Sequence, residues 1–521
     1  MKKRLVFADL LTNIASFSYL LSVTAVLAVV SFCYRVTDFY LKTKASPTLL
    51  DRGFPCMAAA LLILAAVFLF LRQRKPFPSN VRFKWILFGS LFLFAWQTLV
   101  LRHAWFMSRG DDVYYVLGSS LAYGRKEYQF IENAYLELCP NNISLSALYG
   151  LLLRAFMFIT RSEPGPERFR MLIIFMQSAV NVSTCLLVAA AAKRVTGSKT
   201  LSLWTWTLCV LLVGLSPRFL IPYSDSTALA FPVLLFLLWT CLHENKNLLL
   251  SALFGLLSGF AYIIKPHAMI PAIAALICAI LGGIRSPDSI KRRLASTFTA
   301  VLCAVLLIFP ANRMFQNSMH LKIDPNAGLN AAHYFNMGLN TETSGCFSDE
   351  DRSFACSFPT LKERTRGCLR QAIKRLSAMG PSGLMQHAVK KCLVNNADGT
   401  FGWNLDFNRQ PSPPRNALSP ILRSIVYEDG EAHRVLATIQ QIAWQLVLLL
   451  LPFAELARRK ASGFKREAIF MLMLSCLGIL MFNMLLEAKG RYVYTLVPLF
   501  CLLAVCSGEA LFLSLKERFR R

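Results

Sequence analysis

Long apolar stretches, separated by short polar connections, run through almost the whole chain. A membrane-spanning helix needs about 20 predominantly apolar residues, and runs that reach or approach this length predict twelve spans. They cover residues 11–34, 55–71, 85–101, 171–192, 201–215, 228–242, 248–264, 268–281, 297–308, 436–456, 469–486 and 493–513. The pattern therefore predicts an all-α polytopic membrane protein with a bundle of about 12 transmembrane helices.

Basic residues gather in alternate connections between these spans, which orients the bundle. Lys2, Lys3 and Arg4 place the N-terminus in the cytoplasm by the positive-inside rule. Alternation then brings five further basic connections to the same side: Arg72, Arg74 and Lys75; Lys193, Arg194 and Lys199; Arg285, Lys291, Arg292 and Arg293; Arg458, Arg459, Lys460, Lys465 and Arg466; and Lys516, Arg518, Arg520 and Arg521. We expect a multi-pass plasma-membrane protein with both termini cytoplasmic.

One apolar run does not fit this alternation. Residues 143–159 are apolar enough for a span, but counting them would move every later basic connection to the outside. We interpret the run as an amphipathic or re-entrant helix at the outer surface, with Arg154 turned to water or lipid headgroups.

Composition narrows the class of protein further. Of 521 residues, 55% are hydrophobic and 16% charged, and the mean hydropathy is +0.47, values that exclude soluble and disordered classes. The net charge of +27 lies in topology-setting loops, so no nucleic-acid partner is expected. The 15 cysteines include no CxxC motif.

The topology leaves two long outer segments and predicts five regions. These are N-terminal transmembrane helices at 1–101, an outer catalytic loop with juxtamembrane helices at 102–170, central transmembrane helices at 171–312, a small extracytoplasmic domain at 313–435 and C-terminal transmembrane helices at 436–521. Helical spacing is expected over 361–391. The thiols of Cys346, Cys356, Cys368 and Cys392 either form disulfides, in three possible pairings, or stay free.

Ionisable residues gather at four helix ends on the predicted outer face. They are Asp111 and Asp112; Asp225; Lys265 and His267; and Glu487, Lys489, Arg491 and Tyr492. Singly, each has a structural interpretation, such as a helix N-cap for an aspartate or an interfacial position for a cation. Together they place carboxylates that can deprotonate a hydroxyl beside cations that can hold a phosphate leaving group.

These motifs resemble the GT-C superfamily of membrane glycosyltransferases, from about Trp85 to the C-terminus. The run Asp111-Asp112-Val113-Tyr114-Tyr115 is similar to the first outer loop of protein O-mannosyltransferases and lipid A aminoarabinose transferases. The run Cys139-Pro140-Asn141-Asn142-Ile143 is similar to the superfamily's juxtamembrane helix, and Ser216-Pro217 with Tyr223-Ser224-Asp225 to the outer end of a GT-C helix. The segments 337–340, 345–351, 398–401 (Asp-Gly-Thr-Phe) and 487–492 resemble an uncharacterised Gram-positive group known only as GT-C-like.

The resemblance implies an inverting transfer of a hexose or pentose from a polyprenyl-phosphate donor to a hydroxyl acceptor at the outer membrane face. In this interpretation Asp111 is the base, while Lys265 and Arg491 hold the departing phosphate. Asp112 and Asp225 position a substrate, or share Mg²⁺ or Mn²⁺ with Asp111. His267, Glu487 and Tyr492 complete the binding site. The partners implied are the lipid-linked donor, membrane lipids and a glycan, lipid or protein acceptor.

Two other functions remain open. A transporter or flippase could bind a lipid phosphate with the same charges and break no bond, although the outer domain and the lack of internal repeats disfavour it. A cell-wall polymer ligase or acyltransferase would need a histidine-centred site, and only His267 lies near the charged residues. No WWD motif of oligosaccharyltransferases is present, which disfavours transfer to asparagine.

Overall fold

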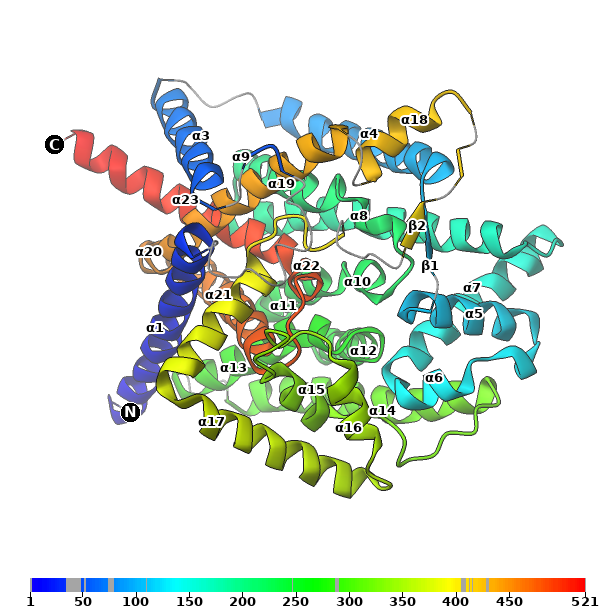
Figure 1. Ribbon diagram of the computed structural model, residues 1–521. Coiled ribbons are helices and arrows are strands. Elements are labelled where there is room, and N and C mark those ends of the chain that lie inside the picture. The colour runs from blue at the N-terminus through cyan, green and yellow to red at the C-terminus, as the bar shows by residue number, and fades with distance from the viewer. Residues whose placement is uncertain are drawn as a thin grey trace.

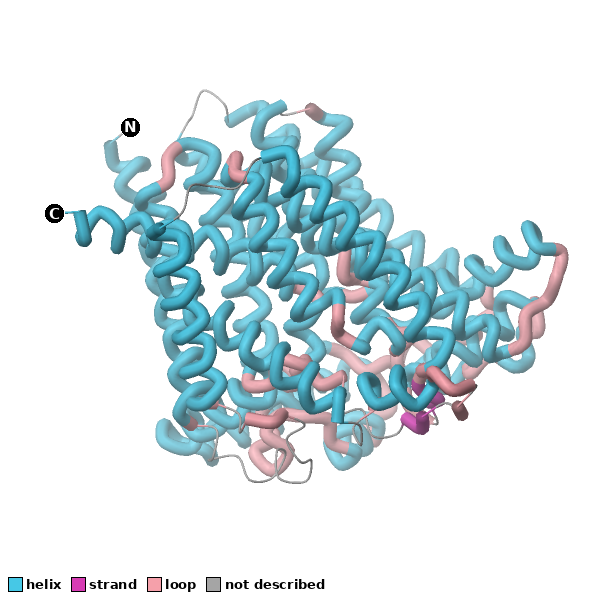
Figure 2. The backbone as a smooth tube through the Cα atoms, turned by 90° about the horizontal axis from the view of Figure 1, so that it is seen from above, coloured by secondary structure: helices cyan, strands magenta, loops and turns pink. Residues whose placement is uncertain are grey.

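The computed structural model describes residues 2–33, 48–50, 53–73, 79–108, 110–245, 247–285, 290–403, 409–411, 413–414, 416–427 and 431–520. Most of these residues are helical, and their one sheet is a two-stranded ribbon. Figure 1 shows the helices packed into one body, and in Figure 2 both termini lie on one side with the two strands on the opposite side.

Each predicted span is a helix. The bounds are α1 (Lys2–Phe32), α3 (Phe54–Gln73), α4 (Ser79–His103), α8 (Pro166–Thr196), α9 (Lys199–Cys209), α11 (Phe231–Asn245), α12 (Leu248–Ile264), α13 (Ile270–Arg285), α14 (Ile290–Ser318), α19 (Glu431–Leu450), α21 (Gly463–Leu485) and α23 (Val497–Arg520). In the described part of the chain, ten helices are long and apolar enough to cross a membrane, and three apolar helices are shorter. The predicted all-α polytopic membrane fold is confirmed.

The outward faces of the spans are apolar. On α14, Phe298, Leu306 and Phe309 are 68%, 60% and 73% exposed. Side chains of this kind on the outside of a bundle are what contact with lipid requires, because lipid tails are as apolar as the protein core. Most buried apolar side chains form one continuous core that joins the first spans to the last.

The first outer segment folds into α5 (Asp112–Arg125), α6 (Asn133–Leu138) and α7 (Ile143–Thr160). Helices α5 and α7 approach closely where each carries a glycine. A Cβ at Gly150 would lie 2.5 Å from the Tyr123 ring and 2.9 Å from the Ser120 carbonyl oxygen. The run 143–159 is therefore helical as expected. By length and composition it could span, so its place at the outer surface stays a prediction.

The expected orientation of Arg154 is wrong. Its guanidinium turns inward, donates to the Tyr123 carbonyl oxygen at 2.6 Å and lies 4.0 Å from the centre of the Tyr123 ring. A planar cation can satisfy a carbonyl and an aromatic face at once. Arg154 therefore fastens α7 to α5 and does not reach out to water or headgroups.

The second outer segment contains α15 (Ala331–Gly338), α16 (Asp349–Cys356), α17 (Leu361–Asn396) and α18 (Ser419–Val426). Strand β2 (Arg409–Pro411) pairs antiparallel with β1 (Phe106–Ser108) and so joins this segment to the end of α4. The helix predicted over 361–391 is present. It is kinked at Gly380, which lies directly before Pro381 and has a φ of 59°. No disulfide joins Cys346, Cys356, Cys368 or Cys392, so of the two predicted alternatives the structure has the thiols.

Short elements complete the chain. The helices are α10 (Ser224–Thr227), α20 (Ala454–Lys460) and α22 (Arg491–Tyr494); the 3-10 turns are Tyr128–Phe130, Pro140–Asn142, Pro217–Leu220, Pro266–Met269 and Leu451–Phe453; and a π-helical turn, Val210–Gly214, continues α9.

The π turn leaves carbonyl groups without helical partners. Gln97 donates to the Gly214 oxygen at 2.7 Å, and Asn181 donates to the Val213 oxygen at 3.1 Å. Polar side chains from α4 and α8 thus satisfy the interrupted helix.

Lys391 connects the outer segment to the end of a span. Its side chain is 1% exposed, and its Nζ donates to the carbonyl oxygens of Gly338, Met484 and Leu486 at 2.8, 2.8 and 2.6 Å. Carbonyls at the C-terminal end of a helix lack helical partners and need donors from elsewhere. One ammonium group therefore ties α17 to the ends of α15 and α21.

We expect Lys391→Met to destabilise the protein strongly. Methionine fills the space but leaves the carbonyls of Met484 and Leu486 without this donor, while the Gly338 carbonyl still accepts from His387. Each such loss costs roughly 1–3 kcal/mol. Lys390→Met is the matched control, because Lys390 lies one residue away and is only half-buried. Thermal unfolding in detergent should show a lower midpoint for Lys391→Met alone. Equal midpoints for the two variants would contradict this role.

Candidate functional site

The buried carboxylate of Asp225 is the centre of the predicted cluster. Asp225 is 2% exposed and lies in α10. It forms an ion pair with Lys265 at the end of α12. Its Oδ2 lies 3.9 Å from Arg218 Nη1 and 3.9 Å from Arg491 Nε, at the start of α22. Three cations from three separate turns therefore surround one carboxylate.

Prolines explain why these turns occur where they do. Pro217 and Pro266 each take the first position of a 3-10 turn, where the missing N–H costs nothing. Lys265, directly before Pro266, is forced into extended backbone with φ −157° and ψ 107°. That backbone ends α12 and turns the Lys265 side chain toward Asp225.

Arg218 belongs to the cluster but was not predicted. It is 1% exposed, donates to the Phe401 carbonyl oxygen at 2.5 Å and lies 5.5 Å from the Tyr494 ring centre. The available signal was a lone arginine directly after Ser216-Pro217, seven residues before Asp225 in an otherwise apolar stretch. A cation in such a place needs an internal partner.

The segment 398–401, quoted for the family resemblance, supports Arg218. The Gly399 N–H donates to Gln441 Oε1 at 2.8 Å. A Cβ at Gly399 would lie 2.6 Å from the Gln440 carbonyl oxygen, so only glycine fits against α19. This contact fixes the position of Phe401, whose carbonyl accepts from Arg218.

Asp112 lies at the solvent-facing edge of the cluster. Its side chain is 41% exposed, and its Oδ2 lies 3.6 Å from Arg491 Nη2. Tyr135 donates to Asp112 Oδ1 at 2.9 Å, and Tyr223 donates to Oδ2 at 3.2 Å. Burial, reinforced by Asp112, raises the pKa of both phenols above the ordinary tyrosine value, so they stay protonated and donate. Asn142 accepts from Tyr223 at 3.3 Å.

Arg491 joins the two carboxylates. Burial alone would lower the pKa of its guanidinium, but Asp225, the neighbouring phenols and Asp112 raise it well above the usual arginine value. Its charge is therefore permanent. The guanidinium carbon also lies 5.1 Å from the Tyr223 ring centre. Lys265, Arg218 and Arg491 thus lie around Asp225, and Arg491 alone also reaches the exposed carboxylate of Asp112.

Asp111 has a different environment from its neighbour. It is the N-cap of α5, and its Oδ1 accepts from the Tyr114 N–H at 2.9 Å. Asp112 is the first residue of the helix, so the two side chains leave the backbone in different directions. The structure therefore brings Asp112 into contact with the cluster and gives Asp111 a capping bond. Which of them is the base stays a prediction.

The other predicted residues line the back of the cluster. His267 is buried, with its ring 5.3 Å from the centres of both Phe482 and Tyr492 and its Nε2 3.5 Å from Thr495 Oγ1. Tyr492 donates to Glu487 Oε2 at 2.7 Å. His267 thus packs against aromatic rings, and Glu487 holds Tyr492.

The three aspartates do not converge as metal ligands. Among the residues that the structure describes, no three His, Cys, Asp or Glu side chains form a group that could hold a metal ion. Asp225 is already matched by cations, and Asp111 uses its Oδ1 to cap α5. The predicted Mg²⁺ or Mn²⁺ stays a prediction, and the chemistry below uses the protein's own groups.

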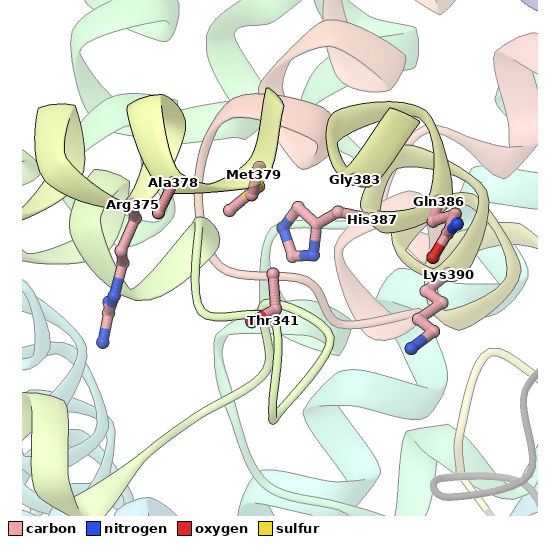
Figure 3. Close-up of a pocket in the computed structure, with 8 residues that line it drawn as sticks. All are labelled: Thr341, Arg375, Ala378, Met379, Gly383, Gln386, His387 and Lys390. Carbon is pink, nitrogen blue, oxygen red and sulfur yellow. The ribbon is translucent and has the colours of Figure 1, made fainter. Parts of the chain in front are cut away.

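A separate cavity of about 320 Å³ lies at the kink of α17. Figure 3 shows its lining residues, which are Thr341, Arg375, Ala378, Met379, Gly383, Gln386, His387 and Lys390. His387 is the buried member, and its Nε2 donates to the Gly338 carbonyl oxygen at 2.9 Å. None of the charged residues around Asp225 lines this cavity.

Comparison with protein families shows where the chain belongs. A family model described as "Conserved hypothetical integral membrane protein" matches residues 7–511. The chain belongs to this family. No curated protein matches this integral membrane protein. The matched residues include both outer segments and every predicted span except the last two residues of 493–513.

Among solved structures, the chain is similar to a crystal structure of the Archaeoglobus fulgidus oligosaccharyltransferase tethered with an acceptor peptide containing the NVT sequon. The sequence identity is 10% and the TM-score is 0.28. The match covers 82% of this chain and 56% of that chain, so this integral membrane protein spans little more than half of that chain's length.

We expect Asp225→Asn to destabilise the folded protein, because Lys265, Arg218 and Arg491 would then lose the carboxylate that all three face. Removing one partner of a buried ion pair costs about 3–5 kcal/mol. Asp112→Asn, at a site 41% exposed, should cost much less. Thermal unfolding in detergent measures both. Pyrophosphate should raise the midpoint of Asp225→Asn more than that of the wild type, and an equal or smaller rise would contradict the charge balance described.

Proposed function

We propose that this protein is an inverting glycosyltransferase that moves a sugar from a polyprenyl-phosphate donor to a hydroxyl acceptor at the outer face of a bacterial plasma membrane. The observation that carries the proposal is Arg491, which contacts the exposed carboxylate Asp112 and the buried carboxylate Asp225 together. A carboxylate open to solvent thus stands beside a permanent cation. The motifs that resemble GT-C enzymes carry these same residues.

The proposed reaction needs one base and one anion site. The carboxylate of Asp112 accepts the proton of the acceptor hydroxyl while that oxygen forms a bond to the anomeric carbon from the face opposite the phosphate. The bond between the anomeric carbon and the phosphate oxygen breaks, and its electron pair leaves with polyprenyl phosphate. Lys265 and Arg491 stabilise the charge that develops on this leaving group.

The structure gives a reason to prefer Asp112 over Asp111 as the base. Asp112 is in contact with Arg491 and two phenols, whereas Asp111 uses its Oδ1 to cap α5. A base must lie next to the acceptor while the cations hold the phosphate, and Asp112 meets this requirement. Asp225 then keeps Lys265 and Arg491 in place. The prenyl chain would lie along the apolar sides of α12, α13 and α23.

Purified protein should release polyprenyl phosphate when incubated with polyprenyl-phosphate sugars and candidate hydroxyl acceptors. Mannosyl, other hexosyl and pentosyl donors identify the sugar. Chromatography of the lipid products measures the release. A flippase or transporter would bind the donor and return it intact, so binding without release over the whole donor and acceptor panel would overturn the proposal.

Asp112→Asn should turn over roughly 10²–10⁴-fold more slowly while still binding donor, because that is the usual loss when a general base is removed. Asp111→Asn is its matched control, with the same chemical change one residue away. Loss of its cap costs about 1 kcal/mol of stability and little turnover. Rates and donor affinities of both variants decide the assignment. A severe loss confined to Asp111→Asn would return the role of base to Asp111.

Arg491→Ala should weaken donor binding and slow turnover, and Arg491→Lys should stay impaired, since an ammonium cannot bridge two carboxylates and a phosphate as a planar guanidinium can. Lys489→Ala removes a cation two residues away and should leave donor affinity nearly unchanged. Isothermal titration with the lipid-linked sugar measures the affinities. Wild-type affinity in Arg491→Ala would place the phosphate site elsewhere.

A further inference from the structure

The first half of α17, residues 361–379, carries apolar side chains on an open surface. Leu369, Ile373 and Leu376 are 42%, 63% and 37% exposed. Their spacing of four and then three residues places them on one face of the helix. Cys368 and Ala372 lie on another face and are fully buried against the rest of the outer segment. The exposed apolar row is therefore distinct from the packing face of the helix.

A basic row runs beside the apolar one. Lys362, Arg366, Arg370 and Lys374 repeat every four residues, and all are exposed. Glu363 is the one acidic residue in α17. A helix with an apolar row flanked by lysine and arginine has the composition of helices that lie in a membrane interface.

The attachment of α17 places it at the level where a span ends. Lys391, in the second half of the helix, donates to the carbonyl oxygens of Met484 and Leu486, directly at the end of α21. The kink at Gly380 then turns the first half away from that point. In Figure 1 this half lies along the lower edge of the molecule, beyond α13 and α14. Figure 3 shows the kink, where Met379 and Gly383 stand on either side of the turn.

We propose that the first half of α17 lies on the surface of the same membrane that the bundle spans and binds anionic phospholipid headgroups. The row Leu369, Ile373 and Leu376 enters the boundary between headgroups and acyl chains. Arg366 and Arg370 contact lipid phosphates. An anionic headgroup binds them better than a zwitterionic one, because it carries no positive group of its own beside the phosphate. The partner is thus the surface of a membrane that has anionic headgroups above an apolar interior.

A photo-crosslinking residue, benzoylphenylalanine, tests this contact in the full-length protein reconstituted in lipid nanodiscs. Placed at Ile373, it should form lipid adducts, detected by mass spectrometry, with a severalfold higher yield in discs containing phosphatidylglycerol than in phosphatidylcholine alone. Ala378 is the matched control position. It is exposed but lies five residues on, about 140° around the helix, and should give few adducts.

Charge variants separate a specific contact from chance proximity. Arg366→Glu with Arg370→Glu should abolish the preference of the Ile373 probe for phosphatidylglycerol. Arg161→Glu with Arg168→Glu makes the same change in total charge at other exposed positions and should preserve that preference. Three outcomes would overturn the proposal: an adduct yield at Ile373 that is equal in the two kinds of disc, adducts to a second copy of the protein, or no lipid adducts.

Discussion

A carboxylate buried at the end of membrane helices is the constraint on which the outer face of this protein depends. Removing Asp225 from water is costly unless its charge is matched at close range. Lys265, Arg218 and Arg491 supply that match from three turns that are far apart in the sequence. The ends of α12, α22 and the 217–220 turn are therefore held together by electrostatics as well as by apolar packing.

The polar residues behind the cluster extend this constraint into the bundle. Gln177 of α8 donates to the Tyr223 carbonyl oxygen at 2.9 Å, and Asn181, one turn further along the same helix, donates to the hydroxyl of Tyr494 at 3.2 Å. Buried amides with several partners fix a single arrangement, because any shift leaves a donor unmatched in an apolar environment. The charged cluster therefore rests on a rigid support, which preorganised stabilisation of a leaving group requires.

The sequence predicted the spans well because the length of an apolar run is read directly from the residue types. It failed where the direction of one side chain decides the outcome. Arg154 could reach out or turn inward, and only the aromatic surface of α5 settles the choice. The different environments of Asp111 and Asp112 depend on the residue at which α5 begins, which a pattern places only within a turn. Arg218 was missed because Phe401, whose carbonyl accepts from it, is distant in sequence, and because Asp225, seven residues on, meets it only where two separate turns fold together.

The carbonyl contacts of Lys391 couple the opening of the outer segment to the opening of the bundle. Two of them cross to the end of α21, and the Ala488 N–H donates to the Gly345 carbonyl oxygen at 2.7 Å. The outer segment and the end of α21 are therefore a single cooperative unit, since separating them leaves hydrogen-bonding groups on both sides unmatched. The outer segment thus supplies the hydrogen-bond donor that the end of α21 lacks. In evolution it would have to change together with residues 484–488, and it could not be exchanged between relatives as an independent module.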